Sequence, residues 1–213
     1  MTTPLVSVVI PSYARPERLR NCLAALARQT MPAEAFEVVV VDDGSPQPIL
    51  LAENTASSGP VVHVIRQPNA GPAAARNRGV QEARGELIAL TDDDCLPTPS
   101  WLESLVTAHR ECPDALVGGI TFNGLADDVF AITSQMIIDL VYEHFNQDDA
   151  SVYFLTSNNI LCTRAAFREL GASLPRFSGR APRTATSATA GDRAASRCDW
   201  CARPRSNIAT LRL

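Results

Sequence analysis

The chain of 213 residues contains no lysine, so arginine supplies all 19 of its basic residues. Asp and Glu together number 23, which gives a formal net charge of −4. A chain without a basic excess exerts no general electrostatic attraction on the phosphates of nucleic acids. We therefore predict that the protein has no nucleic-acid partner.

Long apolar runs are also lacking, because none approaches the roughly 18 residues that a bilayer-spanning helix needs. No basic segment followed by an apolar one opens the chain, so we expect neither a signal peptide nor a membrane span. These absences favour a cytoplasmic protein, with a peripheral position at the inner face of the membrane as a further option.

Metal-binding and disulfide patterns of cysteine and histidine are scarce. The six cysteines are spaced irregularly, and Cys198-x-x-Cys201 has no second pair to complete a zinc site. The three histidines are scattered and show no His-Glu-x-x-His spacing. We therefore expect reduced thiols, structural histidines and no disulfide framework.

A hydrophobic fraction of 46% and a charged fraction of 20% are sufficient for one substantial folded domain. Short apolar β-branched runs alternate with amphipathic segments, which predicts an α/β fold with a mostly parallel sheet covered on both faces. The expected strands are 6–10, 36–41, 61–65, 86–91, 116–120 and 153–155. The expected helices are 15–29, 72–83, 100–110, 129–145 and 164–170, with Ser100 and Glu103 forming a capping box.

Polar residues gather where the predicted strands end. Pro11-Ser12-Tyr13 follows the first strand, Asp42-Asp43 the second, and Asp92-Asp93-Asp94 the fourth. Ligands of open parallel sheets bind at the carboxyl ends of the strands. Three consecutive carboxylates repel one another unless a cation lies among them, so Mg²⁺ or Mn²⁺ is a candidate ligand and a solvated acidic turn is the alternative.

Other residues at this edge suit a nucleotide. Asp42 is expected to close its strand as an Asx turn, which leaves the Asp43 carboxylate to accept hydrogen bonds from a base or ribose. Pro11 and Tyr13 offer apolar and aromatic surface to a base. Arg76 and Arg78, on either side of Asn77 in the first half of a helix, suit a diphosphate, although exposed helix arginines are common.

Four segments in order resemble the hallmarks of family 2 glycosyltransferases of the GT-A fold. They are SVVIPSYARPERLRNCLAALARQT, FEVVVVDDGS, NAGPAAARNRGV and ELIALTDDDCLPTPSWLESL, which together cover residues 5 to about 105. SNNILCTRAAFRELG, at 157–171, resembles the later segment that precedes the acceptor side. The resemblance implies transfer of a sugar from a UDP-, GDP- or dTDP-sugar to a glycan, lipid-linked or small-molecule hydroxyl, with inversion and with Mn²⁺ or Mg²⁺.

The same resemblance assigns the site residue by residue. By position it assigns Pro11, Tyr13, Arg15, Asp43, Asp92 and Asp93 to the nucleotide-sugar, and Asp94 and Asp92 to the metal. Arg76 and Asn77 join the nucleotide-sugar set from their position early in the helix beside the same edge. The family's catalytic base lies in a stretch of the form Glu-Asp-x-Asp/Glu-Phe/Leu-x-x-Arg-Trp, which this chain lacks. The catalytic base is therefore unassigned.

The residues that stand in place of that stretch have a different composition. Residues 1–175 hold 11 Arg against 21 Asp and Glu, whereas residues 176–213 hold 8 Arg against 2 Asp. We expect a GT-A domain over 1–175, with a nucleotide-sugar half over 1–110, the start of an acceptor half over 111–175, and no packed structure over 176–213.

Codon arithmetic suggests an origin for this tail. Residues 182–191 can be encoded as CCG AGG ACC GCG ACT TCT GCG ACC GCT GGC. Reading from the third base gives GAG GAC CGC GAC TTC TGC GAC CGC TGG, or E-D-R-D-F-C-D-R-W, which matches the missing stretch. We hypothesise that the tail is an out-of-frame translation, and an unrelated natural tail is the alternative.

Three functions stay open at this point. The first is a metal-dependent glycosyltransferase, and the second is a truncated nucleotide-sugar-binding module without turnover. The third is another nucleotide-binding α/β enzyme, such as a nucleotidylyltransferase or a dehydrogenase. It is disfavoured because no G-x-G-x-x-G follows the first strand.

Overall fold

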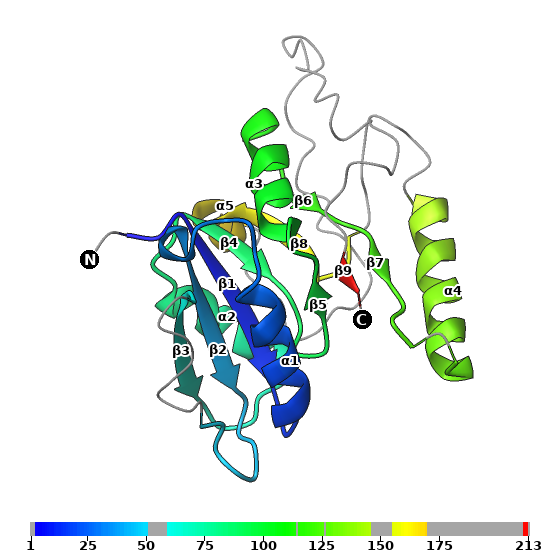
Figure 1. Ribbon diagram of the computed structural model, residues 1–213, viewed down its shortest axis with the longest axis horizontal. Coiled ribbons are helices and arrows are strands. Elements are labelled where there is room, and N and C mark those ends of the chain that lie inside the picture. Colours follow the sequence, from blue (N-terminus) through cyan, green and yellow to red (C-terminus); the bar gives the residue numbers. More distant parts are fainter. Residues whose placement is uncertain are drawn as a thin grey trace.

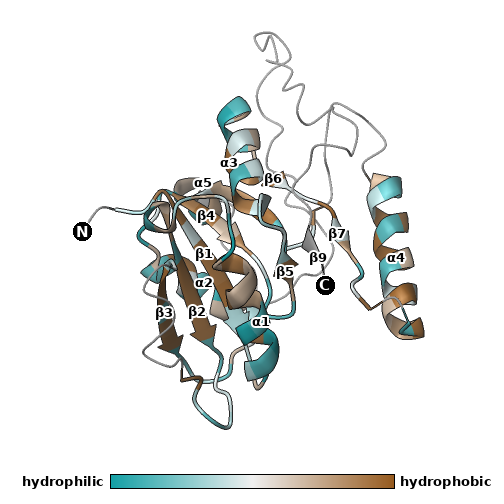
Figure 2. Cartoon of the chain, in the orientation of Figure 1, coloured by the Kyte–Doolittle hydropathy of each residue, from teal (hydrophilic) through white to brown (hydrophobic). Residues whose placement is uncertain are grey.

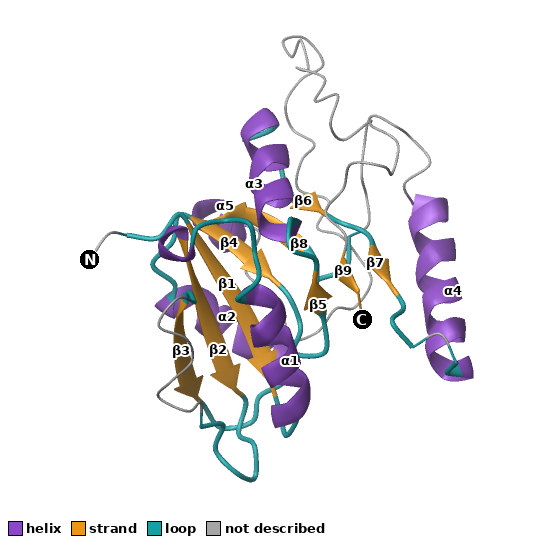
Figure 3. Cartoon of the chain, in the orientation of Figure 1, coloured by secondary structure: helices purple, strands orange, loops and turns teal. Residues whose placement is uncertain are grey.

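The computed structural model describes residues 3–50, 59–113, 115–125, 127–145, 155–169 and 211–212. Its centre is a six-stranded sheet in the order β3-β2-β1-β4-β8-β6 (Figures 1 and 3). The strands are β1 (Val6–Ser12), β2 (Phe36–Asp42), β3 (Val61–Arg66), β4 (Leu87–Leu90), β6 (Val117–Gly118) and β8 (Ile160–Thr163). β1 pairs in parallel with β2 and β4, and β2 with β3, whereas β8 runs antiparallel to β4 and β6. The predicted mostly parallel α/β fold is confirmed.

The register of the parallel strands brings their carboxyl ends to one edge. Ser12 at the end of β1 pairs with Asp42 at the end of β2. Leu90 at the end of β4 pairs with Val9, and the next amide, of Thr91, donates to the Val9 carbonyl. The acidic turns after β2 and β4 therefore leave the sheet beside the end of β1.

Helices cover both faces of the sheet because successive strand residues point to opposite sides. Val8 and Val38 face one core, which is completed by α1 (Pro16–Leu26) and α3 (Trp101–Glu111). Val9 and Val39 face the other core, against α2 (Pro72–Glu82) and α5 (Arg164–Glu169). All residues of β1, β2 and β4 are buried, and Figure 2 shows these strands as mostly apolar.

Close contact between α2 and the sheet depends on a glycine. A Cβ at Gly79 would come within 2.4 Å of Val9 Cγ1 and 3.2 Å of Val41 Cγ2. Only a residue without a side chain lets the helix lie this near the two strands. The resulting short distance keeps the first half of α2 against the carboxyl-end edge.

The remaining elements are smaller or lie apart from this sheet. A 3₁₀ turn, Ala33–Ala35, precedes β2. β5 (Leu96–Pro97), β9 (Leu211–Arg212) and β7 (Thr121–Phe122) form a second sheet in that order. α4 (Val129–Phe145) lies away from the main sheet and exposes apolar side chains, with Phe130 86% exposed (Figure 1). None of the helices described is long and apolar enough to cross a membrane.

Several local predictions differ from the structure. Ser100 precedes α3 but makes no side-chain capping bond, because Glu103 instead accepts a hydrogen bond from Thr30 Oγ1 at 2.6 Å. The capping-box prediction is therefore wrong. The strand expected over 116–120 is only Val117–Gly118, and most of the strand expected over 153–155, together with the tail over 176–210, lies outside the described residues.

Three cysteines of the described part are free and buried, but Cys112 is disulfide-bonded, so the expectation that all thiols are reduced is wrong. The three free cysteines are Cys22, Cys95 and Cys162. Burial raises the pKa of Cys95 to about 12 and that of Cys162 to about 11. These thiols are protonated at neutral pH and are poor nucleophiles. Cys198 and Cys201 lie outside the described residues.

Candidate functional site

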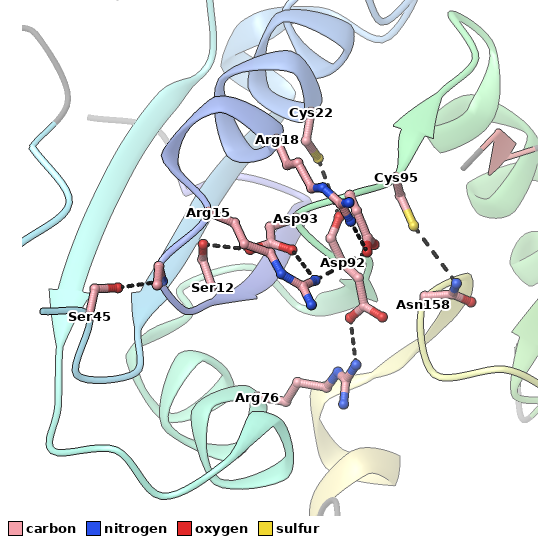
Figure 4. Close-up of polar contacts among 12 residues, drawn as sticks. Ser12, Arg15, Arg18, Cys22, Ser45, Arg76, Asp92, Asp93, Cys95 and Asn158 are labelled. Atoms are coloured by element: carbon pink, nitrogen blue, oxygen red, sulfur yellow. Dashed lines mark hydrogen bonds and ion pairs between the residues drawn. The ribbon is translucent and has the colours of Figure 1, made fainter. Parts of the chain in front are cut away.

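The three consecutive aspartates after β4 make different contacts, with Arg15 shared by Asp93 and Asp94. Figure 4 shows Asp92 beside Arg76 and Asp93 beside Ser12. Asp93 points toward β1, is 4% exposed and accepts a hydrogen bond from Ser12 Oγ at 2.7 Å. Burial is the main cause that raises the pKa of Asp93, and the Ser12 hydrogen bond and the Arg15 charge only partly offset it. Asp93 thus ties the turn to the end of β1.

Asp92 faces α2, where Arg76 forms a short ion pair with it. The Arg76 side chain is only 10% exposed, and its Nε has no hydrogen-bond partner in the described structure. Arg78, two residues later, pairs with Glu82 on the exposed surface of the same helix at 2.7 Å. The common surface role therefore applies to Arg78, whereas the Arg76 side chain points toward Asp92 (Figure 4).

Asp94 faces the start of α1. Arg15 Nη1 lies 3.2 Å and Arg18 Nη1 lies 3.3 Å from the same oxygen, Asp94 Oδ2. Both arginine side chains are more than half exposed, and the Asp94 side chain is 32% exposed. Asp94 is thus about as accessible as Asp92 and far more accessible than Asp93, and two guanidinium groups neutralise it.

The acidic pair after β2 divides into two roles. Asp42 accepts hydrogen bonds from the amides of Ser45 and Ile49 and pairs with Arg66 at 2.8 Å. Burial acts to raise the pKa of Asp42, but these hydrogen bonds and the Arg66 charge outweigh it and lower the pKa. Asp42 therefore closes the strand as interpreted, but through the amide three residues on rather than through the two-residue bond of an Asx turn.

Asp43 orders the loop that leads into α2. Its carboxylate accepts hydrogen bonds from Gln67 Nε2 at 2.7 Å and from the amides of Ala70 at 2.9 Å and Gly71 at 2.8 Å. Asn69 Nδ2 also donates to the Asp43 carbonyl at 2.9 Å. These three hydrogen bonds fix the position of the Asp43 carboxylate. A nucleobase that binds here would therefore contact an acidic loop that is already ordered.

The turn after β1 carries the two residues expected to contact a base. Pro11 is buried in the last part of β1, and Tyr13 is 48% exposed at the edge of the sheet. Ala14 adopts the left-handed conformation, with φ of 55°, and its amide donates to Ser45 Oγ at 2.9 Å. That bond joins the turns after β1 and β2, so Tyr13 and Asp43 are held on the same edge.

Sequence reasoning did not select two residues that lie at this site. Arg18 contacts Asp94, but an arginine on the polar face of an amphipathic helix carries no distinctive signal. Asn158 donates to Cys95 Sγ at 3.7 Å, while its buried Oδ1 has no partner in the described structure. Asn159 anchors this loop by accepting from Trp101 Nε1 at 2.9 Å, and the paired asparagines within residues 157–171 were the available signal.

The carboxylates after β4 suit a hard divalent cation whose remaining coordination positions are filled by substrate oxygens. No group of three or more His, Cys, Asp or Glu side chains in the described ranges is arranged to hold a metal. Mg²⁺ or Mn²⁺ usually keeps one or two protein carboxylates and takes its other ligands from water and a diphosphate. Asp92 and Asp94 meet that requirement in number and type, although each is paired with arginine here.

Comparison with protein families gives one match that covers most of the chain. The profile described as "Glycosyl transferase family 2" matches residues 7–171. Among curated relatives, the glycosyltransferase AglE of Haloferax volcanii is 38% identical over 121 residues, which are 55% of this chain and 40% of the relative. The validoxylamine A glucosyltransferase of Streptomyces hygroscopicus subsp. jinggangensis is 39% identical over 108 residues, or 50% of this chain and 26% of the relative.

Solved structures show the same fold at lower identity. S. aureus TarS 1–349 in complex with UDP-GlcNAc matches with a TM-score of 0.60 and 21% identity, over 77% of this chain and 46% of that chain. The mannosyltransferase PcManGT from Pyrobaculum calidifontis, in complex with GDP-Man and Mn²⁺, matches with a TM-score of 0.60 and 19% identity. That match covers 81% of this chain and 48% of PcManGT. The chain thus spans less than half the length of these relatives and neighbours.

Proposed function

Because this chain belongs to glycosyl transferase family 2, we propose that its carboxyl-end crevice binds a nucleotide-diphospho-sugar with Mn²⁺ or Mg²⁺. The reaction proposed is transfer of the sugar to an acceptor hydroxyl with inversion. Three features support the proposal: the Asp92–Asp94 turn at the end of β4, the buried Arg76 beside it, and the acidic loop after β2. The family assignment argues against a nucleotidylyltransferase or a dehydrogenase.

The nucleotide end of the donor is proposed to lie over the turns after β1 and β2. Tyr13 is exposed there and offers an aromatic ring for stacking, beside the buried Pro11. The Asp43 loop presents an ordered acidic surface for donors on the base or ribose. UDP-, GDP- and dTDP-sugars all fit this arrangement, and the complexes of TarS with UDP-GlcNAc and PcManGT with GDP-Man show two such donors in the same fold.

The diphosphate end is proposed to lie between Asp92, Asp94 and the arginines. A divalent cation bound by Asp94 and Asp92 would neutralise charge on the leaving diphosphate. Arg76, which is 10% exposed beside Asp92, would donate to a phosphate oxygen, and its low exposure would strengthen that hydrogen bond. Asp93 holds the turn in place through Ser12, and Arg15 and Asn77 complete the donor set. The acceptor is proposed to be a glycan, a lipid-linked sugar or a small molecule.

A second candidate is a donor-binding module without turnover. The observation that favours it is the absence of the Glu-Asp-x-Asp/Glu stretch that supplies the family's base. Among the described carboxylates after residue 125, Asp128 accepts hydrogen bonds from the amides of Phe130 and Ala131, and Asp139 accepts one from Gln135. Both carboxylates therefore make hydrogen bonds within α4 or at its start. Donor binding is common to both candidates, and sugar transfer separates them.

Calorimetric titration with UDP and with GDP, each with and without Mn²⁺, tests the proposal. We expect one nucleotide to bind more tightly with Mn²⁺, and Asp94→Asn to abolish that metal-dependent gain. Glu82→Gln is the matched control, because Glu82 pairs with Arg78 on the outer surface of α2. Metal-dependent binding that is undiminished in Asp94→Asn would remove Asp94 from its proposed role.

A further inference from the structure

Two exposed arginines contact Asp94, one of the proposed metal ligands. Arg15 and Arg18 both reach Asp94 Oδ2, at 3.2 and 3.3 Å, and Arg15 also reaches Asp93 Oδ1 at 3.4 Å (Figure 4). A divalent cation and these guanidinium groups would compete for the same carboxylate oxygens. Binding of the cation alone therefore has to break existing ion pairs.

The two arginines are placed so that they can leave Asp94 without disturbing the fold. Arg15 immediately precedes α1 and Arg18 lies in its first turn, and their side chains are 52% and 58% exposed. Exposed ion pairs of this kind are individually weak. Arg76 differs, because it is 10% exposed and fixed beside Asp92.

A nucleoside diphosphate offers the displaced arginines a better partner. Guanidinium groups bind phosphate oxygens through charge-assisted hydrogen bonds that match their fork geometry. A diphosphate bound beside Asp94 lies within reach of the same helix turn. Its entry would release the carboxylate for the cation and keep the guanidinium charges satisfied.

We propose that Arg15 and Arg18 exchange partners, holding Asp94 in the free chain and turning to the diphosphate when the donor binds. The cation then binds weakly alone and tightly with the nucleotide, which is a positive coupling between the two ligands. This inference rests on the proposed function and adds a residue, Arg18, to the donor site. It also explains why both Arg15 and Arg18 contact the Asp94 carboxylate.

Mn²⁺ titration followed by electron paramagnetic resonance, which reports free Mn²⁺, tests the exchange without any measurement of sugar transfer. In the absence of nucleotide, we expect Arg18→Gln to bind Mn²⁺ about two- to fivefold more tightly than the unsubstituted chain, since a competing exposed pair is lost. In the presence of UDP or GDP, the gain in Mn²⁺ affinity caused by the nucleotide should shrink in Arg18→Gln. Arg15→Gln should change Mn²⁺ binding in the same direction.

Arg20→Gln is the matched control for the charge of the helix. Arg20 lies on the same helix, is 68% exposed and has Glu17 as its partner at 3.9 Å. An Arg20→Gln effect as large as that of Arg18→Gln would show general electrostatics and overturn the exchange. Equal Mn²⁺ affinity in Arg18→Gln and the unsubstituted chain, with nucleotide binding retained, would also overturn it. Absence of nucleotide-dependent Mn²⁺ binding in every chain would instead contradict the proposed function on which the exchange depends.

Discussion

Ala14 illustrates how one residue stores strain at the site. Its left-handed backbone conformation is costly for a residue with a side chain, yet its amide is needed to join the turns after β1 and β2. Sequence reasoning gave no sign of this, because nothing in the Ser-Tyr-Ala-Arg run marks a positive φ. The strain is a consequence of bringing two separate turns together.

Relief of this strain should be measurable. We expect Ala14→Gly to raise the free energy of unfolding by about 0.5–1 kcal/mol, since glycine adopts positive φ without steric cost. Chemical denaturation at neutral pH is the measurement. Ala24→Gly, at an exposed position inside α1, is the control and should lower stability by about 1 kcal/mol. Destabilisation by both substitutions would contradict the strain at Ala14.

Glu37 lies at the other end of the sheet and has a buried, fully paired carboxylate. It accepts from Ser7 Oγ at 2.6 Å, from the Arg84 amide at 2.7 Å and from Arg84 Nε at 2.7 Å. Burial acts to raise the pKa of Glu37, but the Ser7 and Arg84 hydrogen bonds and the Arg84 charge outweigh it and lower the pKa. The group therefore stabilises the fold at neutral pH.

The pH dependence follows from the direction of that shift. A carboxyl with a lowered pKa in the folded state contributes stability above its unfolded pKa of about 4.3 and loses it as pH falls through the folded pKa. We expect Glu37→Gln to lower the free energy of unfolding by about 1–3 kcal/mol at pH 7, with a smaller difference in acid. Urea denaturation from pH 7 to pH 3 tests this, with the exposed Glu34→Gln as control. A difference that grows in acid would contradict the assigned role.

At the scale of elements, the contact between α2 and the sheet sets the position of Arg76. Alanine is the better helix former, by about 1 kcal/mol. At Gly79, however, its Cβ would meet Val9 Cγ1 at 2.4 Å. The buried clash exceeds the gain in helix propensity.

We therefore expect Gly79→Ala to destabilise the fold by about 1–3 kcal/mol and to weaken nucleotide binding, because Arg76 lies one turn earlier on the displaced helix. Thermal unfolding and calorimetry with UDP and GDP measure the two effects. Gln81→Ala, on the exposed face of α2, is the comparison and should change neither. An unchanged melting temperature in Gly79→Ala would show that the helix shifts without cost.

Elements built from local patterns were predictable, and those set by tertiary contacts were not. The valine runs and turn residues predicted β1, β2 and the closure of β2 by Asp42, because burial and side-chain geometry decide them locally. The capping box failed because Glu103 contacts Thr30, 73 residues away in the sequence. Arg18 was not selected for the same kind of reason, since only the fold places it beside Asp94.

At the scale of the whole molecule, the described structure contains the proposed donor site but not the family's base motif. We propose that a frame change near residue 176 accounts for this, and sequencing the coding DNA across residues 170–213 tests it directly. A restored frame is expected to encode E-D-R-D-F-C-D-R-W and to raise sugar transfer by about 10²–10⁴-fold, the usual contribution of a general base. Equal transfer rates in the 213-residue chain and the restored chain would place the base elsewhere.

The sheet order has a consequence for synthesis on the ribosome. β4, with all four residues buried, is paired on one side by β1 and on the other by β8, which begins at Ile160, about 70 residues after β4 ends. At a translation rate of about 5–20 residues per second, roughly 4–14 s pass before β8 is made. During that interval an apolar strand presents an open edge that other chains can pair with. We expect the nascent chain to depend on chaperones during this window, before the mature protein covers the edge.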